Sequence, residues 1–257
     1  MARFAAASTH DTCMSVAMTT PYLRLPLSFD VARLQGELAG LNANEWITHF
    51  NTNAYEGGWS CVPLRSVGGV AQHIMPIESD AFADTPVLAR CPYVREVLTQ
   101  FKCETTSVRF MALAPGAHIK PHRDPKTSLE DGVTRLHVPI QTSPEVLFYI
   151  DGTAVHFSAG DAWYLNASCE HAVINPSPQP RVHLMLDCIT NEWLEALFHT
   201  AGGVLRPPPP YPDPQIHDGN VLALIAQFRH MQTTAADEFA ALYEAIYQQR
   251  QSTRATS

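Results

Sequence analysis

Three side chains with metal-ligand chemistry stand in one stretch of the sequence. His122 and Asp124 are two residues apart in an extended segment, and side chains at i and i+2 of a strand point to the same face, so both can reach one ion. His171 lies 47 residues beyond Asp124, so the intervening strands must bring it back, as a closed or double sheet would. Two imidazoles and one carboxylate are the ligand set of a non-haem Fe(II) site with open coordination positions.

A single arginine in an apolar strand is the second feature with chemical meaning. Arg181 follows ten residues after His171, in the strand-like run RVHLMLD. An unpaired buried charge is costly, so a guanidinium that points inward from such a strand needs a partner. A planar anion that accepts two hydrogen bonds is the natural one. The alternative is a surface charge on an edge strand.

The elements that must position these residues are short strands. From Ser107 onward, β-like runs recur at intervals of about 8–12 residues with turn residues between them, which is typical of an all-β sandwich or barrel. The runs are Val108–Ala114, His118–His122, Arg135–Gln141, Val146–Ile150, Ala154–Phe157, Ala162–Leu165, Ala172–Ile174 and Val182–Cys188. Eight such strands predict a mainly β chain with a double-stranded β-helix, a cupin-like jelly roll.

Helical patterns flank this region. Apolar residues at a spacing near 3.6 predict helices over roughly 30–40 and 89–103, and short strands are expected at Trp46–Phe50 and Trp59–Arg65. After Cys188 the sequence predicts a C-terminal helical appendage. We therefore expect a tail over 1–20, a metal-binding domain over 21–190, and an appendage over 191–257 with a proline-rich linker at 207–214. The appendage either covers the mouth of the barrel or forms a homodimer, and the sequence leaves both open.

Composition limits the partners and the compartment. The chain has 17 Lys+Arg against 25 Asp+Glu, a net charge of −8, with no basic run, which argues against nucleic acid or anionic membranes as partners. The six cysteines are scattered without a CxxC pair, so we expect a reducing, cytoplasmic setting. No apolar run approaches the roughly 20 residues of a membrane span, and the N-terminal stretch lacks the apolar segment of a signal peptide.

The motifs together resemble the aspartyl/asparaginyl β-hydroxylase family of Fe(II)- and 2-oxoglutarate-dependent dioxygenases. The resemblance is strongest over 105–190, and a weaker match covers the segment from His49 to Ser66. The matching motifs are Pro-His122-Arg-Asp124, Arg135-Leu-His137-Val-Pro-Ile, Gly160-Asp-Ala-Trp163-Tyr-Leu-Asn166, His171 and Arg181-Val-His-Leu-Met-Leu-Asp187. The animal peptide hydroxylases lack the carboxylate ligand, so the presence of Asp124 places this chain nearer the bacterial branch, which includes proline cis-4-hydroxylases.

This resemblance implies a set of roles. His122, Asp124 and His171 would hold Fe(II), and Arg181 would grip the distal carboxylate of 2-oxoglutarate. Arg135 and His137 match a family motif near the metal-bound end of this cosubstrate. From the residues alone, the Arg135 and His137 pair is equally explained as a structural ion-pair cluster.

The implied activity is hydroxylation of an aliphatic C–H bond of an amino acid or of an aspartyl or asparaginyl residue in a peptide, with O2 consumed and succinate and CO2 released. Two alternatives stay open: hydroxylation of another small metabolite or a lipid acyl chain, and a non-catalytic, metal-binding cupin-like module. Arg65 and Trp59 are candidate substrate contacts. Arg65 is otherwise explained by a surface salt bridge, and Trp59 by the core.

Overall fold

The computed structural model describes residues 19–75, 79, 81–205, 210–213 and 215–255. The chain divides into two compact units, Met1–Arg206 and Pro207–Ser257. The tail expected over 1–20 lies outside the described residues except for 19 and 20, and half of the linker expected over 207–214 lies outside them too. The first unit holds the strands, and the second is helical.

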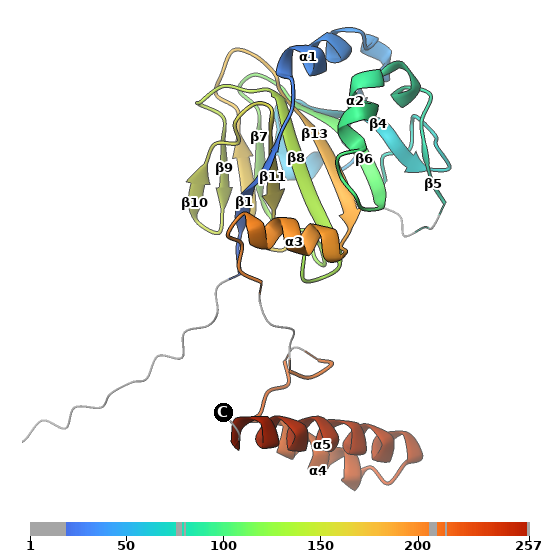
Figure 1. Ribbon diagram of the computed structural model, residues 1–257, viewed down its shortest axis with the longest axis vertical. Helices are drawn as coiled ribbons and strands as arrows, with labels where there is room; N and C mark the ends of the chain where they lie inside the picture. Colours follow the sequence, from blue (N-terminus) through green and yellow to red (C-terminus); the bar gives the residue numbers. More distant parts are fainter. Residues whose placement is uncertain (1–18, 76–78, 80, 206–209, 214, 256–257) are drawn as a thin grey trace, which may run out of the picture. The chain divides into compact units, whose positions relative to one another are not determined.

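The described strands of the first unit form two antiparallel sheets (Figure 1). The larger sheet has the order β1-β11-β8-β13-β6-β4-β2, with β5 paired to β4, and the smaller has the order β10-β9-β12-β7-β3. The strands are β1 (Tyr22–Ser28), β2 (Ile47–Thr48), β3 (Tyr55–Glu56), β4 (Trp59–Val67), β5 (Phe82–Asp84), β6 (Thr105–Leu113), β7 (His118–His122), β8 (Val133–Gln141), β9 (Leu147–Ile150), β10 (Thr153–Val155), β11 (Asp161–Leu165), β12 (His171–Ile174) and β13 (Arg181–Ile189). From β6 to β13 the chain passes repeatedly between the two sheets, which confirms the predicted double-stranded β-helix.

β13 lies in the middle of the larger sheet and is buried on both faces. Its outward-facing residues belong to an apolar core between the sheet and the helices: Val182, Leu184, Leu186 and Cys188. By strand alternation, the opposite face carries Arg181, His183, Met185 and Asp187. Polar groups on this second face point between the two sheets, where the apolar surroundings make each unpaired group costly.

Three helices pack against the outer core of the larger sheet: α1 (Val31–Ala39), α2 (Pro92–Leu98) and α3 (Glu192–Thr200). The side chain of Asp30 caps α1 by accepting a hydrogen bond from the Arg33 amide, and Leu34 is the fully buried contact of this helix. Pro92 begins α2, a position where its missing N–H costs nothing. Short 3-10 turns occupy Ala43–Glu45, Thr52–Ala54 and Leu88–Arg90.

Most expected elements are present, and several bounds differ. Each of the eight predicted strands from Val108 onward matches one strand of β6 to β13, and the first predicted helix is α1. The helix predicted over 89–103 is shorter, because α2 ends at Leu98 and Phe101 bonds back to Leu98 in a tighter turn. β1 was not predicted, although it pairs with β11 and forms the edge of the larger sheet.

Residues 191–200, which the sequence predicts to belong to the C-terminal appendage, lie in the first unit. Leu194 and Phe198 of α3 are buried in the outer core, and the Phe198 ring meets the Tyr164 ring edge-on at 5.1 Å between centroids. The boundary therefore falls after Arg206 rather than after 190. The apolar face of α3 explains the difference, since the first unit needs it to cover the sheet.

The second unit is a helix pair, α4 (Val221–His230) and α5 (Thr234–Ala255). Its own small core contains Tyr211, Ile225 and Tyr243. Asp218, just before α4, accepts hydrogen bonds from Tyr211 and from Arg250 of α5, and so links the segment before α4 to the last helix. Within the described residues, no helix is both long enough and apolar enough to cross a bilayer.

Candidate metal and anion-binding site

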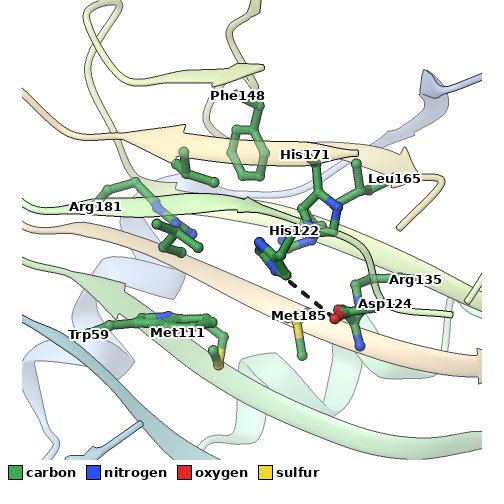
Figure 2. A pocket seen from close by; sticks show the side chains of 13 residues that line it. Trp59, Met111, His122, Asp124, Arg135, Phe148, Leu165, His171, Arg181 and Met185 are labelled. Carbon is green, nitrogen blue, oxygen red and sulfur yellow. Dashed lines mark hydrogen bonds and ion pairs between the residues drawn. The ribbon is translucent and has the colours of Figure 1, made fainter. Parts of the chain in front are cut away.

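The three predicted metal ligands lie together at one end of the smaller sheet. His122 is the last residue of β7 and stands opposite His171, the first residue of β12, with 4.2 Å between ring centroids. Asp124 follows two residues after His122, and its Oδ1 lies 4.0 Å from His122 Nε2. One ligand atom from each of the three residues lies within 4.8 Å of the others (Figure 2). With this spacing, all three atoms can bind one ion from the same side.

Backbone carbonyls fix both imidazole rings. His122 Nδ1 lies 2.8 Å from the Lys120 carbonyl oxygen, and His171 Nδ1 lies 3.0 Å from that of Cys169. A carbonyl only accepts, so each Nδ1 carries the hydrogen and each Nε2 keeps a lone pair. Both rings therefore offer Nε2 to a metal, and the bond at Nδ1 sets their orientation.

A buried arginine orients the carboxylate ligand. Arg135 in β8 forms an ion pair with Asp124 Oδ2, which leaves Oδ1 for an ion. The same guanidinium donates two hydrogen bonds to Asp187 in β13, at 2.7 Å from Nε and 3.1 Å from an Nη atom. Asp124 thus has one oxygen held by the protein and one available.

The ionisation states match metal binding. Burial lowers the pKa of His171 to about 4, so this ring is neutral at pH 7. Burial alone would raise the pKa of Asp124, but the Arg135 guanidinium and the neighbouring rings of His171 and His122 together outweigh burial and hold this pKa below its ordinary value. A neutral imidazole and an ionised carboxylate are the forms that bind metals.

Arg181 points into the same cavity without a protein partner (Figure 2). It is only 3% exposed, and its guanidinium makes no hydrogen bond to any residue within the described ranges. Its charge lies 5.4 Å from the centre of the Phe148 ring. Burial lowers the pKa of Arg181 to about 10, so the group is still charged at pH 7. A buried cation of this kind requires an anion, and a carboxylate fits its planar fork.

Two further histidines lie at the cavity, one in its lining and one next to the first. His137 lines it, and His183 lies 3.4 Å from His137 between their Nδ1 atoms. Burial lowers the pKa of both well below the ordinary value, so both rings are neutral. Neither Nε2 has a hydrogen-bond partner in the part of the chain that the structure describes. His137 is therefore available to a ligand, whereas Arg135 is already held by Asp124 and Asp187.

The two residues predicted to contact substrate, Trp59 and Arg65, lie in different surroundings. Trp59 lines the cavity and stacks on His49, with 3.6 Å between ring centroids and 17° between planes. Arg65 lies further along β4 and is not among the cavity residues. Its guanidinium donates to Asp84 at 2.8 Å and to the carbonyl oxygens of Phe82 and Thr105. These contacts fit the alternative of an ion pair between β4 and β5, and a substrate role for Arg65 stays a prediction.

Two residues of the site carry no predicted role. Asp187 holds Arg135, and alternation from Arg181 along β13 is the signal that places it on the inner face. His49 lies against Trp59, and its burial is the main reason that its pKa falls to about 4. Nothing in the sequence around His49 indicates this stacking, because it depends on the pairing of β2 with β4.

The remaining lining of the cavity is apolar. It is formed by Met111, Ile119, Phe148, Leu165, Val173 and Met185. Such a lining limits the access of water to a bound ion and strengthens electrostatic contacts inside. The cavity therefore offers three ligands for an ion and one arginine for an anion among apolar side chains.

A jelly roll with a two-histidine, one-carboxylate cluster and an unpaired arginine defines a class of metal-dependent oxygenases. The family model described as Aspartyl/Asparaginyl beta-hydroxylase matches residues 29–191, so this chain belongs to the aspartyl/asparaginyl β-hydroxylase family. The match covers β2 to β13 and all three ligands, which agrees with the resemblance drawn from the motifs.

The individual curated proteins that match share less than a third of the aligned residues with this chain. The chain is 30% identical over 173 residues to L-proline cis-4-hydroxylase of Rhizobium meliloti (strain 1021), which covers 66% of this chain and 61% of that protein. It is 26% identical over 137 residues to L-proline cis-3-hydroxylase 1 of Streptomyces sp, which covers 51% of this chain and 47% of that one. The chain thus spans less than two thirds of the length of these curated relatives. A solved structure of an oxidoreductase of the 2OG-Fe(II) oxygenase family from Burkholderia pseudomallei aligns with 66% of this chain and 86% of its own, at 13% identity and a TM-score of 0.46.

Proposed function

We propose that this protein is an Fe(II)- and 2-oxoglutarate-dependent dioxygenase that hydroxylates an aliphatic C–H bond of an amino acid. The observation that carries the proposal is the presence in one cavity of the clustered ligands His122, Asp124 and His171 and the unpartnered Arg181. A metal-binding module without catalysis has no need of a buried arginine that lacks an anion. Family membership supports the same reaction class.

The residues present fit the cofactor and the cosubstrate. His122 Nε2, His171 Nε2 and Asp124 Oδ1 would hold Fe(II), and Arg181 would hold the distal carboxylate of 2-oxoglutarate. Bound Fe(II) supplies the activation of O2, so that one oxygen atom enters the C–H bond of the substrate and the other enters succinate as CO2 is released. His137 lines this cavity, and its Nε2, which has no partner among the described residues, would be a further polar contact for the cosubstrate.

The protein orients the metal ligand and the cosubstrate and surrounds them with apolar side chains. Arg135 fixes the plane of the Asp124 carboxylate through Asp187, so the ligand needs no rearrangement when the metal binds. Arg181 ties down one end of the cosubstrate and leaves its keto-acid end for the metal. The apolar lining limits the contact of the reactive centre with bulk water.

We propose a free amino acid as the substrate, with L-proline first in order of test. The relatives with the printed names L-proline cis-4-hydroxylase and L-proline cis-3-hydroxylase support this choice. Asp124 supports it too, since the motif comparison places a chain with this carboxylate nearer the bacterial amino-acid hydroxylases.

We also propose that the C-terminal helix pair forms a homodimer rather than a cover for the barrel. Leu222, Phe239 and Leu242 are each about half exposed on α4 and α5, a large apolar contribution for a solvent-facing surface. The mass in solution by light scattering, for the wild type and for Leu242→Glu, tests this. A monomeric wild type would contradict it.

The experiment for the activity combines two readouts. The purified protein with Fe(II), ascorbate and 2-oxoglutarate is offered a panel of amino acids, and succinate is measured beside a product that has gained one oxygen atom. We expect both to rise together for one amino acid and to vanish in Asp124→Ala, whereas Asp84→Ala, which removes a surface carboxylate, keeps both. Undiminished succinate in Asp124→Ala would refute the metal assignment, and turnover of only a fatty acid or another metabolite would refute the substrate class.

A further inference from the structure

A second arginine of β6 lies on the inner face of the larger sheet. Arg109 pairs in register with Met185 of β13 and with Pro63 of β4. Paired residues of antiparallel strands present their side chains to the same face, and Met185 lines the cavity. Met111, two residues further along β6, lines it as well. Arg109 therefore belongs to the face that carries the cavity, where it borders the lining residues Met111 and Met185 and is not itself part of the lining.

Within the part of the chain that the structure describes, no anion is paired with this guanidinium. Arg109 is partly buried, and among the described residues it has neither a hydrogen bond nor an ion pair. Burial lowers the pKa of Arg109, and the strongest opposing charge is the carboxylate of Asp187. Both oxygens of that carboxylate are already bonded to Arg135. Arg109 thus resembles Arg181, whose missing partner is the cosubstrate.

The charges of the inner face leave one cation without a counterion. Three guanidiniums, those of Arg109, Arg135 and Arg181, face the two carboxylates of Asp124 and Asp187. Under the proposed function, Fe(II) brings two positive charges and 2-oxoglutarate two negative ones, which cancel. One positive charge then remains on this face, and a substrate with a single carboxylate would neutralise it.

The position of Arg109 separates it from the cosubstrate arginine. Arg181 pairs with Leu113, four residues along β6 from Arg109, or about 13 Å between backbone positions at the rise of a strand. After burial, the charge of Arg109 is the next largest cause of the low pKa of His49, ahead of the charge of His122. His49 stacks on Trp59, which lines the cavity. The two arginines therefore serve different parts of the site.

We infer that Arg109 binds the carboxylate of the substrate, so that the enzyme acts on a small molecule with a free carboxylate and not on a residue inside a peptide. This inference rests on the proposed function and extends it. With the carboxylate held at Arg109, the aliphatic part of the substrate lies beside Met111 and Met185, which pack in one apolar cluster with Cys61. A bidentate carboxylate also explains an arginine here in place of a lysine.

The test compares each amino acid with its amide. The amino acid that gives most succinate release with the wild type is paired with its carboxamide, which has the same shape without the charge. Binding of both to the anaerobic enzyme loaded with Fe(II) and 2-oxoglutarate is measured by calorimetry, and KM and kcat are measured in air. The variants are Arg109→Met, Arg109→Lys and, as a control for loss of a positive charge, Arg95→Met on the exposed face of α2.

We expect the wild type and Arg95→Met to prefer the acid over the amide. Arg109→Met should bind the acid about 10- to 100-fold more weakly, which is the loss of affinity expected when a hydrogen bond to a charged group is removed. This variant should also lose most of the preference for the acid over the amide. Arg109→Lys should recover part of it. The melting temperature of Arg109→Met should equal or exceed that of the wild type, because the substitution removes a partly buried charge without a partner.

Two results would overturn the inference while the proposed function stands. One is a wild type that turns over an amino acid but accepts its amide equally well. The other is an Arg109→Met variant that keeps the full preference for the acid, with or without a lower melting temperature, which would make Arg109 a structural residue. A wild type that consumes no 2-oxoglutarate with any amino acid would instead refute the proposed function, and the inference with it.

Discussion

Arg135 and Asp187 form a doubly hydrogen-bonded pair across neighbouring strands β8 and β13, at 2.7 and 3.1 Å. The nitrogen of Arg135 that is left over forms the ion pair with Asp124. A carboxylate on β13 therefore sets the orientation of a metal ligand in the loop after β7. In metal sites, outer contacts of this kind commonly decide affinity as much as the ligands themselves do.

Asp187→Asn should weaken metal binding without removing a ligand. The amide cannot hold the Arg135 guanidinium through two charged hydrogen bonds, so Asp124 loses its fixed orientation. We expect Fe(II) affinity to fall by about 10- to 100-fold. Calorimetric titration with Fe(II) under nitrogen measures it. Asp84→Asn, which loosens the exposed pair with Arg65, is the matched control, and equal affinities in all three proteins would contradict this role of Asp187.

Arg181→Met should separate metal binding from cosubstrate binding. Among the described residues the side chain has no hydrogen bond or ion pair to the three ligands, so Fe(II) affinity should change by less than about threefold. The affinity for 2-oxoglutarate should fall by at least about 100-fold, since one partner of a buried charge pair is removed. Equilibrium binding of 2-oxoglutarate to the Fe(II)-loaded variant provides the measurement. Wild-type affinity in this variant would show that another group holds the distal carboxylate.

Arg65→Ala should affect stability and leave substrate use unchanged. The substitution leaves the carbonyl oxygens of Phe82 and Thr105 without their donor and breaks a partly exposed ion pair with Asp84. We expect the free energy of unfolding to fall by about 1 kcal/mol. Denaturation in urea and steady-state kinetics test both parts. A KM for the amino acid that rises tenfold in Arg65→Ala would place Arg65 in the substrate site.

The metal-free protein should lose stability as the pH falls below about 6.5. The pKa values of His137 and His183 lie well below the ordinary value in the folded state, so between the two values the unfolded chain binds protons that the folded chain does not. The free energy of unfolding then decreases with falling pH, by up to about 1.4 kcal/mol per pH unit for each histidine. His183→Gln should reduce this slope by about one proton, measured by urea denaturation from pH 7.5 to 5. An unchanged slope would show that His183 is protonated in the fold.

The parts of the site that could be predicted from the sequence are those set by a local pattern. The two-residue spacing of His122 and Asp124 and the alternation of β13 place side chains on a face without knowledge of the partner strand. The eight strands from β6 to β13 have clear turn signals between them, which explains why each was found. Family motifs added the roles that spacing alone left open.

The parts that could not be predicted depend on register between distant segments. Arg135 meets Asp187 because β8 and β13 pair residue to residue, and Arg65 meets Asp84 because β4 pairs with β5. The position of α3 depends on the apolar area that the sheet leaves uncovered, and its helical pattern does not reveal the surface on which it packs. Local periodicity carries no information on such long-range contacts.

The most direct test of the central claim is an anaerobic titration of the metal-free protein, first with Fe(II) and then with 2-oxoglutarate. If His122, Asp124 and His171 hold the metal beside Arg181, a weak visible charge-transfer band should form with one equivalent of each. The band should be absent in His171→Ala and require far more 2-oxoglutarate in Arg181→Met, and air should then release succinate. Iron that binds tightly to the wild type without a band and without succinate would contradict the assignment of this site as an oxygenase centre.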